Sequence, residues 1–138
     1  MGMYTQIRGW LNINSIGSIG NDAENKLTEI LNEAKSLFEL RTDLDRTWVC
    51  NDTLIHFGAN GSAWLFIGTE LKNYDDSVDE WIKTLLKCFP NAEGRIDYQY
   101  EEDDEDTGSR YLLIYNGKII KDGIGETWCK GYGNTFIY

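Results

Sequence analysis

The stretch YTQIRGWLNI, residues 4–13, decides the fold, because apolar and polar positions alternate along it. One face carries Thr5, Ile7, Gly9, Leu11 and Ile13, and the other carries Gln6, Arg8, Asn12 and the rings of Tyr4 and Trp10. A period of two residues is typical of a strand with one buried face. We therefore predict a half-buried strand, with Tyr4 and Trp10 on its polar side.

Two other stretches carry apolar residues every three or four positions, as amphipathic helices do. The first is 22–40. The second begins at Ser77-Val78-Asp79-Glu80, which matches the S-x-x-E capping box, and ends before Pro90, which cannot continue a helix. Both apolar stripes must be buried in the folded protein, and we expect them to pack on the sheet.

The remaining elements are short and rich in β-branched and aromatic residues, which favours strands. We predict two strands within 47–71 turning at Asn60-Gly61, one over 94–102, a pair over 110–120 turning at Asn116-Gly117, and a last short strand in 126–138. The segment AWLFIG (63–68) is apolar on both parities, which indicates a central strand that is covered on both faces or lies across the core.

The order of these elements predicts one α+β domain spanning residues 1–138. We expect an antiparallel sheet with two helices on one face, in the ferredoxin-like order β-α-β-β-α-β, followed by a C-terminal hairpin or strand. No internal repeat or domain boundary interrupts the sequence.

Composition narrows the class of function. The net charge is −10, from 13 basic and 23 acidic residues, whereas proteins that bind nucleic acid directly are usually basic. No apolar window is long enough for a membrane span, and the N-terminus resembles no signal peptide, so we expect a cytoplasmic protein. Cys50, Cys88 and Cys129 form no C-x-x-C pair and His56 is the single histidine, so we predict reduced thiols and neither metal nor cofactor.

An acidic run stands between two predicted strands, and two interpretations of it stay open. It consists of Glu101, Glu102, Asp103, Asp104, Glu105 and Asp106. Thr107-Gly108-Ser109 is typical of a loop, so the run can be a solvated hairpin tip. Alternatively it faces a partner, because an extended chain advances about 3.3 Å per residue, close to the roughly 3.4 Å between phosphates along one DNA strand. The spacing does not match an EF-hand.

Further acids join this surface if the fold brings them near. They are Asp97 and the acids at the start of the second helix, Asp75, Asp76, Asp79 and Glu80. In this interpretation the acids occupy the basic groove of a nucleic-acid-binding enzyme, and the protein inhibits that enzyme.

Aromatic residues are the other candidates for a site. Exposed Tyr4 and Trp10 would be interface anchors, unless the segment 126–138 folds over them. Trp10, Trp48 and Trp128 could instead line a pocket for a small molecule. A Cys-His nucleophile would need His56, but nothing selects one of the three cysteines, so we predict no catalytic residue.

The strand containing Gly9-Trp10, the DEWIKTLL helix and the acidic segment before YNGKII resemble small bacterial and phage-borne proteins with an N-terminal "GW" strand. Immunity proteins of polymorphic toxin systems are among these. The resemblance implies a non-enzymatic protein that binds and neutralises a basic protein partner, either a toxin nuclease or a nucleic-acid-processing component of a defence system. It carries no site residue with it.

Overall fold

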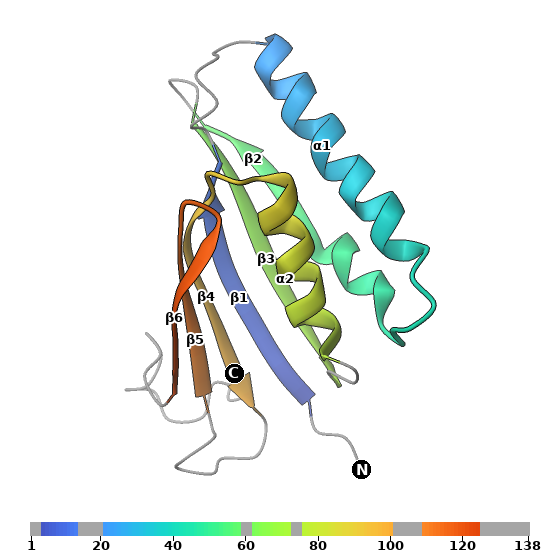
Figure 1. Ribbon diagram of the computed structural model, residues 1–138, viewed down its shortest axis with the longest axis vertical. Helices are drawn as coiled ribbons and strands as arrows, with labels where there is room; N and C mark the ends of the chain where they lie inside the picture. The colour runs from blue at the N-terminus through green and yellow to red at the C-terminus, as the bar shows by residue number, and fades with distance from the viewer. Residues whose placement is uncertain (1–3, 14–20, 59–61, 73–75, 101–108, 125–138) are drawn as a thin grey trace.

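The computed structural model describes residues 4–13, 21–58, 62–72, 76–100 and 109–124, which form a six-stranded antiparallel sheet with two long helices on one face (Figure 1). This confirms the α+β class. The elements are β1 (Tyr4–Asn12), α1 (Asn21–Glu39), the 3-10 helix η1 (Thr47–Asp52), β2 (Thr53–Phe57), β3 (Ala63–Lys72), α2 (Ser77–Cys88), β4 (Glu93–Tyr100), β5 (Ser109–Tyr115) and β6 (Lys118–Ile124).

The strand order is β2-β3-β1-β4-β5-β6, so β1 lies inside the sheet between β3 and β4. The exact ferredoxin-like order is not matched, because the hairpin β5-β6 extends the sheet to six strands beyond β4. Asn116 and Gly117 form the predicted turn of this hairpin, with φ values of 51° and 69°. The Gly117 N–H donates a hydrogen bond of 2.9 Å to the Ala92 carbonyl, which ties the turn to the start of β4.

The core lies between the sheet and the two helices. Leu37 of the first predicted stripe is 60% exposed, but most residues of both stripes are buried, with Leu27, Leu31, Ala34 and Phe38 from α1 and Val78, Trp81, Ile82 and Leu85 from α2. They pack against the apolar face of the sheet, to which β1 contributes Ile7 and Leu11, both 0% exposed. From Ile7 to Asn12 the alternation in β1 is therefore confirmed, because only one face of this strand meets helices, whereas Gln6 on the opposite face is also buried, at 6% exposed.

The first strand predicted within 47–71 begins later than expected. Residues 47–52 form the 3-10 helix η1, in which the consecutive residues Val49 and Cys50 are both buried. A strand would place two neighbours on opposite faces. Because η1 packs against both α1 and α2, it buries the two side chains together, and the strand starts only at Thr53.

The prediction that AWLFIG is covered on both faces is wrong. Ala63, Leu65 and Ile67 are buried towards the helices, but Phe66 on the opposite face is 46% exposed. The apolar residues of the second parity thus form a surface rather than a second core.

The helix α2 begins at Ser77, the first residue of the predicted capping box, and Ser77 is buried. Its N-cap is Asp76, which has a left-handed φ of 53° and no side-chain cap hydrogen bond. Glu80, the last residue of the predicted box, pairs with Arg41 and Lys83. The predicted turn at Asn60-Gly61 and the predicted strand in 126–138 lie outside the described residues.

Candidate functional site on the open face of the sheet

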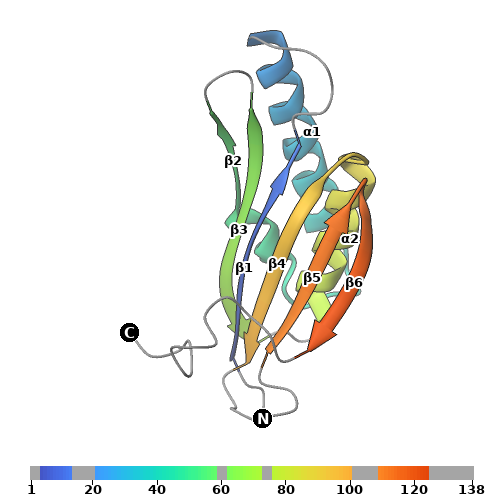
Figure 2. The same ribbon diagram turned by 90° about the vertical axis from the view of Figure 1, so that its left-hand side faces the viewer.

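The face of the sheet opposite the helices is not covered by any helix of the described residues (Figure 2). Strand register arranges its side chains in rows. One row runs Leu54, Phe66, Trp10 and Arg95 across β2, β3, β1 and β4. The next row runs Gly68, Arg8 and Asp97 across β3, β1 and β4, with Asp52 beside Gly68 at the start of β2.

Three residues of the first row are apolar and exposed. Leu54 is 65% exposed, Phe66 46% and Trp10 43%. The Trp10 ring packs edge-on against Trp64, with centroids 5.1 Å apart, so its orientation is set by a neighbour in β3. Adjacent exposed aromatic and aliphatic side chains on rigid strands are typical of an interaction surface.

The second row is polar, and its groups are held by hydrogen bonds. The Arg8 guanidinium donates to the Gln6 side-chain oxygen at 2.8 Å, and the Asp52 carboxylate accepts from the Thr69 hydroxyl at 2.6 Å. Gly68, between Arg8 and Asp52, has no side chain, and a Cβ added there would meet no atom within 4 Å. The row therefore has a gap at Gly68.

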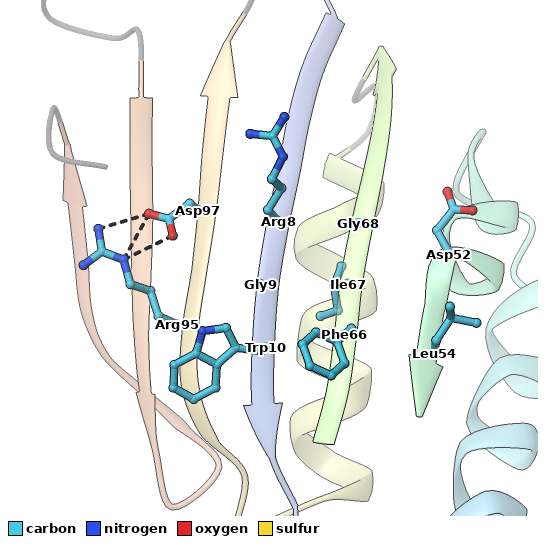
Figure 3. Close-up of a pocket in the computed structure, with 10 residues that line it drawn as sticks. All are labelled: Arg8, Gly9, Trp10, Asp52, Leu54, Phe66, Ile67, Gly68, Arg95 and Asp97. Atoms are coloured by element: carbon cyan, nitrogen blue, oxygen red, sulfur yellow. Dashed lines mark hydrogen bonds and ion pairs between the residues drawn. The ribbon is translucent and has the colours of Figure 1, made fainter. Parts of the chain in front are cut away.

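The two rows enclose a shallow depression of about 810 Å³ (Figure 3). Trp10 and Phe66 lie side by side along it, while Arg8 and Asp52 stand on either side of the empty position of Gly68. Its volume falls within the range of roughly 300–1,000 Å³ that is usual for ligand pockets. The depression thus combines an apolar wall with a few fixed polar groups.

Asp97 lies at the edge of this depression but is only 8% exposed. The Arg95 guanidinium donates to its carboxylate at 3.0 Å and lies over the Tyr111 ring, 4.5 Å from the centroid. Burial raises the pKa of Asp97 above its ordinary value, and the bond from Arg95 opposes part of that rise. The predicted partner-facing carboxylate is therefore already matched by a basic side chain of the same strand.

The other predicted site residues fall in different places. Trp10 is exposed on the open face, as expected of an anchor. Tyr4 begins β1, but its side chain lies outside the described part of the chain, as do Glu101, Glu102, Asp103, Asp104, Glu105 and Asp106. Tyr100, the last residue of β4 before the acidic run, pairs with Thr5, so β4 ends where β1 begins.

The acids at the start of α2 are on the helix side, not beside Asp97. Asp79 accepts hydrogen bonds from the Tyr98 hydroxyl and from Arg110, the latter at 3.3 Å. Glu80 pairs with Arg41 and Lys83, each at 3.1 Å. These carboxylates are matched by basic groups of the same chain, so they do not join Asp97 in one surface. Asp76 is exposed at the N-cap, and Asp75 lies outside the described residues.

The predicted pocket of three tryptophans is not assembled around the depression. Trp10 lines it, but Trp48 belongs to η1 and is absent from its lining, and Trp128 lies outside the described residues. His56 is on the open face, edge-on to Phe66. Cys50 is on the helix side, where burial and the Glu39 carboxylate raise the pKa of its thiol to about 11, so these two residues form no nucleophilic pair.

Sequence reasoning missed Arg8, Asp52, Leu54, Phe66 and Gly68. A signal for two of them was present, because Phe66 and Gly68 share a parity of β3 with the charged residue Glu70. A strand face that mixes an aromatic ring, a glycine and a carboxylate differs from a buried face, and a glycine inside a strand can mark the close approach of a ligand.

Comparison of the chain with protein-family models, with curated proteins and with solved structures gives no match. None of the helices in the described ranges has both the length and the apolar character needed to cross a membrane. Within the same ranges, no three His, Cys, Asp or Glu side chains are grouped so that they could hold a metal ion.

Proposed function

We propose that this protein is a non-enzymatic binding protein that neutralises a basic protein partner through the open face of its sheet. The partner is a toxin nuclease or a nucleic-acid-processing component of a defence system, so the role is immunity or phage counter-defence. The observation that carries the proposal is the exposed row of Trp10, Phe66 and Leu54 on the adjacent strands β1, β3 and β2. Tryptophan in particular dominates the binding energy of many protein interfaces.

Charge supports the choice of a basic partner. The chain carries a net charge of −10, and six acids stand consecutively at 101–106. A negative protein attracts a positive one over distances of about 8 Å at cellular salt, which raises the association rate. In this proposal the acidic run speeds encounter and the aromatic row sets the lifetime of the complex.

A second candidate, a small-molecule-binding module, is favoured by one observation. The depression beside Trp10 and Phe66 has a volume of about 810 Å³ and fixed polar groups at Arg8 and Asp52. Titration of the tryptophan fluorescence with nucleotides and metabolites separates the two candidates. A saturable response to one compound below roughly 0.1 mM supports the module, and the inhibitor proposal expects none in that range.

The inhibitor proposal is tested by co-expression with candidate toxin nucleases of basic charge, scored as rescue of growth, and by surface plasmon resonance with each purified pair. We expect Trp10→Ala and Phe66→Ala each to weaken binding at least about 10-fold, as truncation of a central anchor does. Leu37→Ala is the matched control, because Leu37 is an apolar residue 60% exposed on the helix side.

The electrostatic part has its own readout. Raising the salt concentration, or combining Glu102→Lys with Asp104→Lys, is expected to slow association while leaving dissociation nearly unchanged. Equal losses in Trp10→Ala and Leu37→Ala would refute the open face as the contact surface. Unchanged association rates in both charge tests would refute the steering role of the acids.

A further inference from the structure

Nothing in the described residues explains the gap at Gly68. Gly68 does not adopt a left-handed backbone conformation, and a Cβ at this position would stand in open space. Gly9 differs, because a Cβ there would come within 2.8 Å of the Arg95 carbonyl oxygen. Gly94 is likewise closed by the β1 backbone. The neighbouring strands thus account for two glycines of this region but not for the third.

We propose that the gap above Gly68 receives one large apolar side chain from an exposed loop of the partner protein. The inference rests on the proposed function and identifies the centre of its contact surface. This side chain packs over Gly68 and contacts the Phe66 and Trp10 rings and Leu54. The peptide groups on either side of it lie between Arg8 and Asp52.

The charges around the gap favour a neutral occupant. Arg8 and Asp52 have opposite signs on the two sides of Gly68, and Asp97 is matched by Arg95. An inserted lysine would be attracted by Asp52 and repelled by Arg8, and an inserted carboxylate the reverse, so neither sign gains a net attraction. A neutral apolar side chain gains from burial against the rings without the cost of removing a charge from water.

The polar groups at the rim suit a peptide backbone. Arg8 uses one N–H on Gln6, and a guanidinium has five N–H donors, so it has further donors for a carbonyl oxygen. Asp52 accepts one bond from Thr69, and a carboxylate can accept about four, so it has sites left for an N–H. A donor and an acceptor on opposite sides of an apolar site match the C=O and N–H groups that flank a side chain.

The test is a titration of the ¹⁵N-labelled full chain with N-acetyl-L-phenylalanine amide, followed by ¹H–¹⁵N NMR. This probe presents one large apolar side chain between two peptide groups. With about 15 heavy atoms at roughly 0.3 kcal/mol each, its dissociation constant is expected on the order of 1 mM. Signals of Gly68, Phe66 and the Trp10 indole are expected to shift, whereas the N-acetyl amides of lysine, glutamate and alanine are expected to bind at least 10-fold more weakly.

Gly68→Val fills the gap without a clash and is expected to abolish the response. Ser109→Val is the matched control, because it adds the same side chain to the open face of β5, away from the depression, and is expected to keep the response. The inference is overturned by the absence of shifts at 50 mM probe, by equal binding of a charged probe, or by a full response in Gly68→Val. These outcomes leave the partner assay with Trp10→Ala as a separate test of the proposed function.

Discussion

The hydrogen bond between Trp81 and Thr53 gives a sharp prediction about the element that carries one side of the site. The Trp81 indole N–H donates to the Thr53 hydroxyl at 2.7 Å, and the two residues are 1% and 0% exposed. Thr53 stands between Asp52 and Leu54, which line the depression. Thr53→Val keeps the shape of the side chain but removes the acceptor, so a buried N–H loses its partner.

The expected size follows from the burial of the pair. An unsatisfied buried donor costs about 1–3 kcal/mol of unfolding free energy. A chain of 138 residues unfolds with an entropy of about 0.29 kcal/mol/K, at about 2.1 cal/mol/K per residue. Each kcal/mol therefore lowers the Tm by about 3.4 °C, and Thr53→Val is expected to lower it by about 3–10 °C.

The assay is urea and thermal unfolding, followed by circular dichroism, of Thr53→Val, Trp81→Phe and the double variant. Removing both partners leaves no orphaned donor, so the double variant is expected to lose at least about 1 kcal/mol less than the sum of the single losses. Thr53→Ser is the control, since it keeps the hydroxyl. Additive losses, or a Thr53→Val protein as stable as the wild type, would refute the reasoning.

Two further predictions concern the strands of the open face. Gly94→Ala is expected to lower the free energy of unfolding by about 3 kcal/mol or more, because the new Cβ would clash with the backbone carbonyl of Trp10 in β1. Gly68→Ala, whose Cβ meets open space, is expected to stay within about 0.5 kcal/mol of wild type. Both are measured by urea unfolding, and similar stabilities of the two variants would contradict the prediction. The raised pKa of Asp97 means that the folded state holds its proton more tightly than the unfolded state, so its contribution to stability falls as pH rises from about 3.8 through the folded pKa. Unfolding at a series of pH values is therefore expected to show wild type losing stability relative to Asp97→Asn over this window, and a relative gain would contradict it.

Local pattern was enough to predict the elements that meet water on one side only. The two helices and β1 from Ile7 onward have a single buried face, so their alternation or stripe marks it directly, whereas Gln6 on the open face of β1 is buried against this pattern. The prediction of a strand over 47–52 was wrong because Trp48 and Val49 favour strands locally. The 3-10 helix η1 forms because its contacts with α1 and α2 allow Val49 and Cys50 to be buried together.

The site was harder to predict, because it depends on which strands become neighbours. Trp10 could be placed on the polar face of its own strand from sequence. The gap at Gly68 exists only because register sets Gly68 between Arg8 and the residue before β2. Apolar residues on both parities of β3 are consistent with a strand that is covered on both faces. They are equally consistent with a strand that exposes an aromatic row, and the choice depends on where the helices pack.

The position of β1 also has a consequence for how the protein is made. Leu11 is opposite Leu65 on one side and Gly94 on the other, so both neighbours of this strand are synthesised much later. At about 5–20 residues per second, the interval from Leu11 to Gly94 lasts roughly 4–17 s. The sheet therefore closes only when most of the chain has left the ribosome, and the apolar face of β1 lacks its native neighbours until then.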